Sequence, residues 1–503
     1  MKLPLSFLFA ALLPALALGA PIENSKSKID NLPSPAPTNS HCSNLTAAPD
    51  GTLHLTYYGP APASAPVVEP AARTLWHATL APGATTFSVP RPIVTTPLLM
   101  ENWADFASLC VGTDGALTAQ WFQKPDASAG GHGYDGWYSR SDDAGRTWRT
   151  PARLGHEFVA LAPLSQGRTL AVWLESARVR DPHAPRKKRP APTPALKSEI
   201  SNPHSSPDPK PQTPDPSPAS APAMKLLARL LAPDGSTLQE WTVDPDVCTC
   251  CQNTVAVLPG DRVFAAYRGH TADEIRDNKF STFDLATRTW SEPATLRDDG
   301  WKIAACPVNG PAADTRGPAL AVAWFTAAHG IARVHAAYSG NSARTFTDPV
   351  TIDLGRPMGR LETVMLADQT ALILWMETGT AENTAGIYAR RLWPDGRLSA
   401  PQLIADSAQA RSSGFPRAAL RPSGRVVISF TQPGETNHVR LLELDPTALT
   451  RPTALSAFPP AAHPVSDLKS EISDTLPDSS PRRSAPLEFC IAPLTSLHPL
   501  FSP

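Results

Sequence analysis

The sequence has almost no excess of charge of either sign: its formal net charge at pH 7 is −1, and its isoelectric point is about 6.9. This balance gives no indication of a nucleic-acid ligand or of a strongly charged membrane surface as a partner. Long apolar runs are missing beyond the first 20 residues, so no stable membrane span is expected. No segment keeps an apolar period of about 3.6 residues, so a helical fold is not expected either.

Short runs rich in β-branched and aromatic residues recur along the chain, each bounded by Gly, Pro or Asp. Such runs are typical of strands, and together they predict an all-β protein. The clearest runs are residues 169–174, 225–230, 263–267, 320–325, 371–375 and 425–430.

The most informative short motif is the octet from Ser141 to Trp148, which reads Ser-x-Asp-x-Gly-x-Thr-Trp. In a hairpin turn, the side chains of Ser141 and Asp143 can accept backbone N–H bonds, and Gly145 can adopt a positive φ. Thr147 completes the pattern, and Trp148 can anchor the turn in a neighbouring sheet. The octet therefore predicts a tight hairpin with an aromatic anchor.

Weaker copies of the end of this octet recur at intervals of roughly 50 residues. In each copy an aromatic residue or Leu acts as the anchor, and Pro usually follows three positions later. The anchors are Phe87, Trp148, Trp241, Trp290, Phe346, Leu398 and Leu449. A hairpin unit repeated in this way predicts a β-propeller. Six blades are favoured and seven are the alternative, because a propeller closes its ring by pairing strands from both ends of the chain.

Proline is abundant, with 56 residues, and its clusters divide the chain. The N-terminus resembles an export signal, because Lys2 precedes an apolar stretch that ends in small residues; a buried helix is the alternative. The Pro-rich polar segments cannot bury enough apolar surface to fold, so disorder is predicted there. The expected divisions are a signal peptide (1–20), a linker (21–48), a propeller (49–455) with a disordered insertion (179–224), and a C-terminal tail (456–503). We therefore expect an exported protein, periplasmic or extracellular.

Four of the seven cysteines gather in one part of the sequence, at Cys248, Cys250, Cys251 and Cys306. In an oxidising compartment this grouping predicts disulfides. A thiolate site for zinc or a softer metal is an alternative, although adjacent ligands are not the usual spacing, and free thiols are another. The remaining cysteines are Cys42 and Cys490, which could pair, and Cys110, which is expected in the core.

The same part of the sequence departs most from the repeat in its charged and aromatic residues, and function is often placed at such departures. Tyr267 and Arg268 are followed by Glu274, Arg276 and Asp277. For each charged residue taken alone, a surface salt bridge is the alternative interpretation.

Further candidates lie just downstream. Trp301 could stack on a sugar, with a core position as the alternative, and Asn309 lies in the turn Cys-Pro-Val-Asn-Gly-Pro. Arg360 and Glu362 stand where a strand begins, and they could face a central cavity. Arg417 is a further available arginine.

The octet, the repeated hairpins and the export signal resemble the sialidase (neuraminidase) superfamily, in which the octet is known as the Asp-box or BNR repeat. The segments Cys-Thr-Cys-Cys (248–251) and Cys-Pro-Val-Asn-Gly-Pro (306–311) also resemble bacterial exported proteins of the exo-α-sialidase-like type. The resemblance covers roughly residues 50–455 and implies a six-bladed propeller.

The resemblance further implies three arginines that grip a substrate carboxylate, a tyrosine nucleophile activated by a glutamate, and an acid/base aspartate. Residues of these types are Arg268, Arg276 and Arg360 for the carboxylate, Tyr267 as nucleophile, and Asp277, Glu274 or Glu362 for acid/base work. The family's Arg-Ile-Pro motif is not matched, because residues 91–93 read Arg-Pro-Ile. This departure leaves open whether the protein is an enzyme.

The expected function is that of an exported sialidase-like glycoside hydrolase acting on a terminal acidic sugar such as sialic acid. The alternative is a non-catalytic propeller that binds a glycan or a protein, and a metal or redox centre on the cysteines is a third, weaker idea. A glycan or glycoconjugate is the expected partner. A monomer without cofactor or metal ion is expected.

Overall fold

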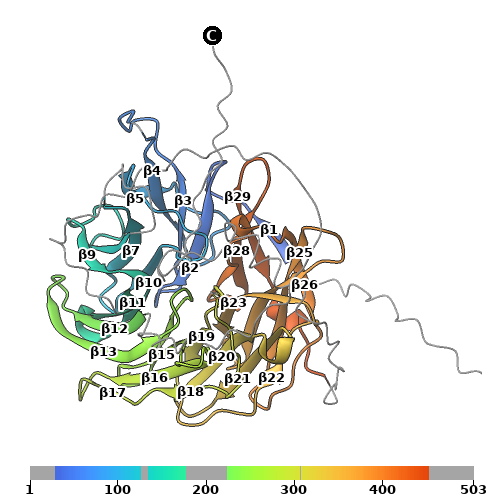
Figure 1. Cartoon of the computed structure of the whole chain (residues 1–503). Coiled ribbons are helices and arrows are strands. Elements are labelled where there is room, and N and C mark those ends of the chain that lie inside the picture. Colours follow the sequence, from blue (N-terminus) through green and yellow to red (C-terminus); the bar gives the residue numbers. More distant parts are fainter. Residues whose placement is uncertain (1–28, 69, 126–133, 177–223, 306, 453–503) are drawn as a thin grey trace, which may run out of the picture.

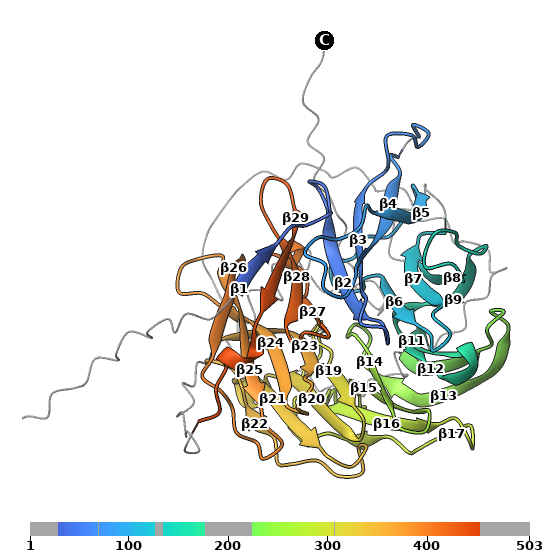
Figure 2. The ribbon, with the colours of Figure 1, turned by 180° about the vertical axis from the view of Figure 1, so that it is seen from behind.

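The computed structural model describes residues 29–68, 70–125, 134–176, 224–305 and 307–452. Within these ranges the strands form seven antiparallel sheets arranged in a ring (Figure 1), and Figure 2 shows the ring from behind. The all-β prediction is confirmed. The helices of the described ranges are short 3-10 turns: η1 (Ser165–Gly167), η2 (Ala328–Gly330), η3 (Arg411–Ser413) and η4 (Pro446–Ala448). None of them is long and apolar enough to cross a membrane.

Each sheet is one blade, and the strands of each blade follow from the innermost outward. Blade 1 holds β2 (His41–Ala47), β3 (Leu53–Pro60), β4 (Arg73–Leu80) and β5 (Arg91–Thr96). Blade 2 holds β6 (Ser108–Val111), β7 (Leu117–Gln123), β8 (Asp135–Ser141) and β9 (Ala152–Gly155). Blade 3 holds β10 (Glu157–Pro163), β11 (Thr169–Ser176), β12 (Met224–Leu231) and β13 (Thr237–Val247).

The remaining blades follow the same order. Blade 4 holds β14 (Thr254–Leu258), β15 (Arg262–Arg268), β16 (Asn278–Asp284) and the short β17 (Thr289–Trp290) and β18 (Ala294–Thr295). Blade 5 holds β19 (Ala312–Arg316), β20 (Ala319–Thr326), β21 (Arg333–Ser339) and β22 (Val350–Thr351). Blade 6 holds β23 (Pro357–Met365), β24 (Ala371–Thr378), β25 (Thr384–Leu392) and β26 (Gln402–Ala408). Blade 7 holds β27 (Arg417–Leu420), β28 (Val426–Gln432), β29 (His438–Leu444) and β1 (Ile29–Leu32).

The ring is closed by strands from both ends of the described chain. Strand β1 pairs with β29, with Ile29 opposite Leu444, and so completes blade 7. The innermost strands contact one another in the order β2, β6, β10, β14, β19, β23, β27 and back to β2. Closure by both termini is therefore confirmed.

The blade number is seven, the alternative, rather than the favoured six. Each predicted anchor lies in a blade of its own: Phe87 stands between β4 and β5 of blade 1, and Leu449 follows β29 of blade 7. The six-blade interpretation required the first and last anchors to share one sheet. Instead, the N-terminal strand that completes blade 7 carries no anchor.

The propeller begins earlier than the predicted boundary at residue 49. Residues 29–32 form β1 and residues 41–47 form β2, although both fall in the predicted linker. The reason is that Ile29 and Leu32 suffice to pack the outer strand β1 against the core, and that residues 42–45 are buried in β2. The predicted signal peptide and tail lie outside the described residues, as does the insertion except for Met224, which begins β12.

The octet forms the turn between β8 and β9, and its side chains hold the turn as predicted. The N–H of Gly145 donates to the Ser141 hydroxyl (2.9 Å), and the N–H and hydroxyl of Thr147 donate to the Asp143 carboxylate (2.9 and 2.7 Å). Gly145 has a φ of 79°. Trp148 packs against a core cluster that blades 1 and 2 share.

A second copy of the octet, of which only the anchor Phe346 was predicted, forms the turn between β21 and β22. Residues 339–346 place Asn341 where the first copy has Asp and Ala343 where it has Gly. The N–H of Ala343 donates to the Ser339 hydroxyl (3.1 Å), and the N–H of Thr345 donates to Asn341 Oδ1 (3.0 Å). The hydrogen bonds therefore match those of the first copy, and Phe346 anchors the turn.

Replacing Gly145 with Ala is expected to lower the free energy of unfolding by about 2 kcal/mol, because a side chain at positive φ costs about 1–2 kcal/mol and the new Cβ would lie 2.6 Å from His77 Nδ1. Gly115→Ala is the matched control, since Gly115 has a φ of 78° and open space around it. Denaturant unfolding measures both. Equal losses in the two variants would show that the contact with His77 contributes nothing.

Candidate functional site

A central cavity of about 930 Å³ lies inside the ring, lined by residues of the innermost strand of every blade. Glu362 lines this cavity from the middle of β23 and not from its start, whereas Arg360, predicted to face the cavity with it, is not among the lining residues. Ligand sites in proteins are commonly concave, with a few polar groups converging on an otherwise apolar wall. The cavity is therefore the first place to look for a site.

Three innermost strands begin with a bulge. The pairing register shifts near the start of β2, β10 and β23, and at these places Cys42, Phe158 and Arg360 have φ values of 51°, 52° and 54°. Bulges re-aim side chains and gather beside functional sites, where strained backbone also concentrates. The strain thus lies where the strands enter the cavity.

Arg417, at the start of β27, joins three neighbouring blades at the cavity wall. Its Nε lies 2.8 Å from the Glu362 carboxylate on blade 6 and donates to Asn44 Oδ1 on blade 1 at 3.1 Å. Its guanidinium carbon lies 5.3 Å from the centre of the Phe106 ring. A quarter of the Arg417 side chain remains exposed, so this arginine can still meet a ligand.

The carboxyl group of Glu362 is buried, and its environment changes its acidity. Burial raises the pKa of Glu362 to about 7, opposed by the charge of Arg417 and by the N–H of Thr363. Desolvation disfavours the charged form of an acid, which accounts for the direction. Glu362 is therefore poised to gain or lose a proton near neutral pH.

This shift predicts a pH dependence of stability. The folded protein binds the Glu362 proton more tightly than the unfolded chain, so ionisation opposes folding as the pH rises from the ordinary pKa of 4.5 to about 7. Over this window the wild type should lose a few kcal/mol of unfolding free energy relative to Glu362→Gln. Denaturant unfolding at several pH values measures the difference. Parallel curves for the two proteins would contradict the assignment.

A second buried carboxyl group, Asp105, lines the cavity and was not singled out in the sequence. The hydroxyl of Tyr134 (2.8 Å) and the N–H of Phe158 (3.0 Å) donate to its Oδ2. Burial raises the pKa of Asp105 to about 8, against the effect of these two hydrogen bonds. Its position just before the innermost strand β6 is the signal that could have found it.

Aromatic side chains form part of the cavity wall. The Phe415 ring lies 5.8 Å from Phe106 and is stacked on Trp103 at 6.0 Å. The guanidinium of Arg360 lies over the Trp103 ring at 4.9 Å. Phe106 and Phe415 both line the cavity, so an apolar face is available to a ring-shaped ligand.

Arg268, predicted to bind a carboxylate, lies in the interior. It is 2% exposed, and its guanidinium donates to the backbone carbonyls of Asn309, Arg276 and Phe325 at 2.7–3.1 Å. The Trp301 ring covers it at 4.9 Å. Trp301 is itself 4% exposed and packs on Phe325, so it takes the core position rather than that of a sugar platform.

The predicted cluster of Glu274, Arg276 and Asp277 is brought together, but it lies beside the cysteines. Arg276 Nη2 contacts the Glu274 carboxylate at 2.7 Å, and Nη1 donates to Cys248 Sγ at 3.3 Å. Asp277 accepts the backbone N–H groups of residues 300 and 301 at 2.8 and 2.9 Å. None of the three lines the central cavity.

Tyr267, predicted as the nucleophile, is 1% exposed and belongs to the core between blades 3 and 4. Its hydroxyl donates to Asp244 Oδ2 at 3.0 Å. Burial raises the pKa of its phenol, and the Asp244 charge adds to the effect. The structure thus holds Tyr267 in its neutral form and away from the cavity.

Arg360 and Asn309 fasten neighbouring blades. Arg360 Nη1 donates to the carbonyls of Ala410 (3.0 Å) and Gly414 (3.4 Å). The Asn309 amide donates to the Met358 carbonyl (3.1 Å) and accepts the N–H of Arg360 (2.8 Å). The substrate-binding role predicted for Asn309 is therefore not apparent in its contacts.

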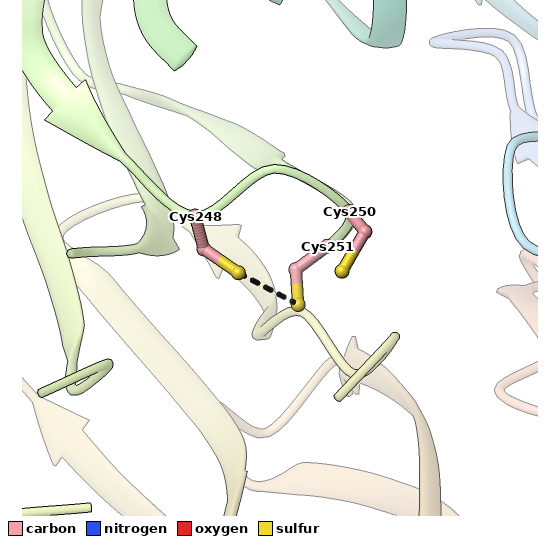
Figure 3. A group of neighbouring side chains, drawn as sticks. All are labelled: Cys248, Cys250 and Cys251. Atoms are coloured by element: carbon pink, nitrogen blue, oxygen red, sulfur yellow. Dashed lines mark hydrogen bonds between the residues drawn. The ribbon is translucent and has the colours of Figure 1, made fainter. Parts of the chain in front are cut away.

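Three cysteines converge in the loop between β13 and β14 (Figure 3). The sulfur atoms of Cys248, Cys250 and Cys251 all lie within 4.8 Å of one another, with 3.9 Å between Cys248 and Cys251. All three side chains are buried. Hydrogen bonds from the other two thiols and the nearby arginines lower the pKa of Cys248.

Among the described residues no disulfide joins Cys248, Cys250 and Cys251, and the predicted pairings with Cys306 lie outside the described residues. A disulfide needs its sulfur atoms about 2.05 Å apart, far closer than the 3.9 Å between Cys248 and Cys251. Cys110 is buried, as predicted. Cys306 and Cys490 lie outside the described residues.

No protein-family model matches this sequence, and no curated protein matches it. Solved structures with a similar chain course include a protein of unknown function from Dyadobacter fermentans (14% identity, TM-score 0.42, 83% of this chain and 98% of that chain). An α-L-arabinanase from Penicillium chrysogenum, complexed with arabinobiose, is 11% identical (TM-score 0.41; 84% and 98%). A sialidase from Trypanosoma rangeli, in complex with the inhibitor DANA, is 10% identical (TM-score 0.38; 78% and 58%). Similarity this distant leaves the function to be argued from the site.

Proposed function

We propose that the central cavity binds an acidic sugar and that the chain hydrolyses a glycosidic bond there. The observation that carries the proposal is the pair of Arg417 and Glu362 at the cavity wall, beside the Phe106 ring. A guanidinium binds a carboxylate through two parallel hydrogen bonds, and an aromatic face stacks on a sugar ring. A sugar carboxylate would thus bind the Arg417 guanidinium, either in place of Glu362 or together with it.

The two buried carboxyl groups supply an acid and a base, because their surroundings give them different pKa values. Asp105, with its pKa of about 8, keeps its proton at neutral pH and donates it to the leaving oxygen. Glu362, with its pKa of about 7, is partly ionised and accepts a proton from the attacking water. The bond from the anomeric carbon to the leaving oxygen breaks, and the water oxygen takes its place.

The substrate we propose is a terminal sialic acid or a hexuronic acid, since both carry a carboxylate on the ring. A non-catalytic glycan-binding propeller is the second candidate. This candidate is favoured because three side chains expected to be catalytic instead make contacts within the fold. They are Arg268, Arg276 and Tyr267.

The experiment measures hydrolysis of three fluorogenic glycosides by the wild type and by Arg417→Ala. The glycosides are a sialoside, a glucuronide and a neutral galactoside. Turnover of an acidic glycoside is expected, with kcat/KM at least about 10-fold lower in the variant, because a charged hydrogen bond is lost. Arg149→Ala is the matched control, since Arg149 forms an exposed ion pair with Asp142.

The outcomes separate the two candidates. Binding of the acidic sugars without turnover, measured by calorimetry and weakened in Arg417→Ala, would support the binding propeller instead of the hydrolase. Neither turnover nor binding of an acidic sugar by the folded protein would overturn both.

A further inference from the structure

The loop that carries Cys248, Cys250 and Cys251 is built to bring three sulfur atoms to one point. It connects β13 to β14, and the Cys248 N–H donates to the Arg268 carbonyl at 3.0 Å, which fixes the start of the loop. The three sulfurs lie within 4.8 Å of one another (Figure 3). Zinc thiolate sites have metal–sulfur bonds of about 2.3 Å, which places the sulfurs about 3.8 Å apart. The loop would therefore need to close only slightly for the three sulfur atoms to bind one ion.

The three cysteines are buried in the core. All three cysteines are at most 1% exposed and belong to one core cluster with Val247 and Tyr267. Buried thiols usually act as small apolar side chains scattered through the core, as Cys42 does in the cluster that blades 1 and 2 share. A core has no packing reason to converge three of them, so the convergence points to a ligand.

The neighbouring charges favour thiolates. Arg276 Nη1 donates to Cys248 Sγ at 3.3 Å, and Glu274 holds the same guanidinium at 2.7 Å from its other side. A monovalent ion bound by three thiolates leaves negative charge in excess. The Arg276 cation, fixed against the sulfur, would offset part of that charge.

From these contacts we propose that Cys248, Cys250 and Cys251 bind one soft, thiophilic metal ion, Cu(I), with Arg276 as the positioning residue that stabilises the thiolates. Sulfur-only donor sets select soft metals over Mg²⁺ or Ca²⁺, which need oxygen ligands. Thiolates are among the ligands that select Cu(I), and the three described sulfur atoms are enough to hold it. The site lies apart from the central cavity and does not depend on the proposed hydrolase function.

The test uses the full chain, purified without oxygen and with its thiols counted as reduced. Cu(I) is titrated against a chromophoric Cu(I) chelator, and Zn²⁺ against a zinc indicator. One equivalent of Cu(I) is expected to bind, with Zn²⁺ held more weakly, and the X-ray absorption spectrum should show sulfur ligands alone. Oxygen or nitrogen ligands would overturn the site, and equal affinity for both metals would overturn the selectivity.

Variants then locate the ion. Cys250→Ser and Cys251→Ser should abolish stoichiometric binding, whereas Cys42→Ser and Cys110→Ser, which alter buried free thiols elsewhere, should leave it unchanged. Circular dichroism checks that each variant folds. Binding that survives in Cys250→Ser and Cys251→Ser, or no binding by reduced wild type, would overturn the proposal.

The role of Arg276 has a separate readout. Arg276→Gln should lower the Cu(I) affinity by about 10-fold or more, as losses of outer partners at metal sites do, and should shift the thiolate-to-copper absorption band. Arg276→Lys, which keeps the charge, should restore most of the affinity. An unchanged band and affinity in Arg276→Gln would show that Arg276 serves the fold alone.

Discussion

Replacing Glu362 with Gln should lower kcat for an acidic glycoside by about 10²–10⁴-fold, the range for loss of a general acid/base group. Gln keeps the size of the side chain and its place against Arg417, but it cannot take a proton from water. The wild-type rate should also fall as the pH drops below about 7, where Glu362 becomes protonated. Steady-state kinetics over a range of pH measures both effects.

Glu377→Gln is the control for this prediction. Glu377, on β24 of the same blade, is also buried, and burial raises its pKa to about 7. Its carboxylate accepts hydrogen bonds from Trp375 Nε1 and from the Arg356 N–H, and it does not line the cavity. Glu377→Gln should therefore leave kcat unchanged. A similar loss in both variants would mean that the effect comes from the fold of blade 6 and not from chemistry.

The largest effect on stability is expected from Arg268→Met, which should lower the free energy of unfolding by about 3 kcal/mol or more. Arg268 is 2% exposed and satisfies the carbonyls of three residues, including Phe325. Its removal leaves those carbonyls without donors, and each buried unsatisfied group costs about 1–3 kcal/mol. Thermal or denaturant unfolding measures the loss.

Arg229→Met is the matched control, because Arg229 lies on β12 of the neighbouring blade 3 and pairs with the half-exposed Glu240. An exposed ion pair contributes at most about 1 kcal/mol, so this variant should unfold nearly like the wild type. If Arg268→Met were equally mild, the interior role of Arg268 would be contradicted, and the guanidinium would again be a candidate for binding substrate.

Much of the fold could be predicted from the sequence because its signals are local. Turn chemistry fixed the hairpin at Ser141–Trp148, and the spacing of the anchors indicated repeated blades. The blade number could not be decided in that way, because it depends on which strand pairs with β29 at the far end of the chain. Apart from its anchor, the second octet was missed because Asn341 and Ala343 replace the two residues that identify the motif.

The candidate site was predicted only in part. Glu362 was predicted at a strand start facing the cavity; it does line the cavity, but from the middle of β23. Arg268 and Tyr267 were grouped with it because they are charged or nucleophilic and adjacent in sequence. Side-chain direction alternates along a strand, and neighbouring blades decide which face is buried, so adjacency could not reveal that both lie inside. Asp105 meets Tyr134 and Phe158 only after blades 2 and 3 have packed.

The central claim is that an acidic sugar binds in the central cavity with its carboxylate on Arg417. The most direct measurement is a crystal structure of Glu362→Gln with sialic acid or glucuronic acid at saturating concentration. The expected result is a sugar in the cavity, with its carboxylate within hydrogen-bond distance of the Arg417 guanidinium and its ring against Phe106 or Phe415. A sugar bound outside the cavity, or inside it with its carboxylate away from Arg417, would contradict the claim.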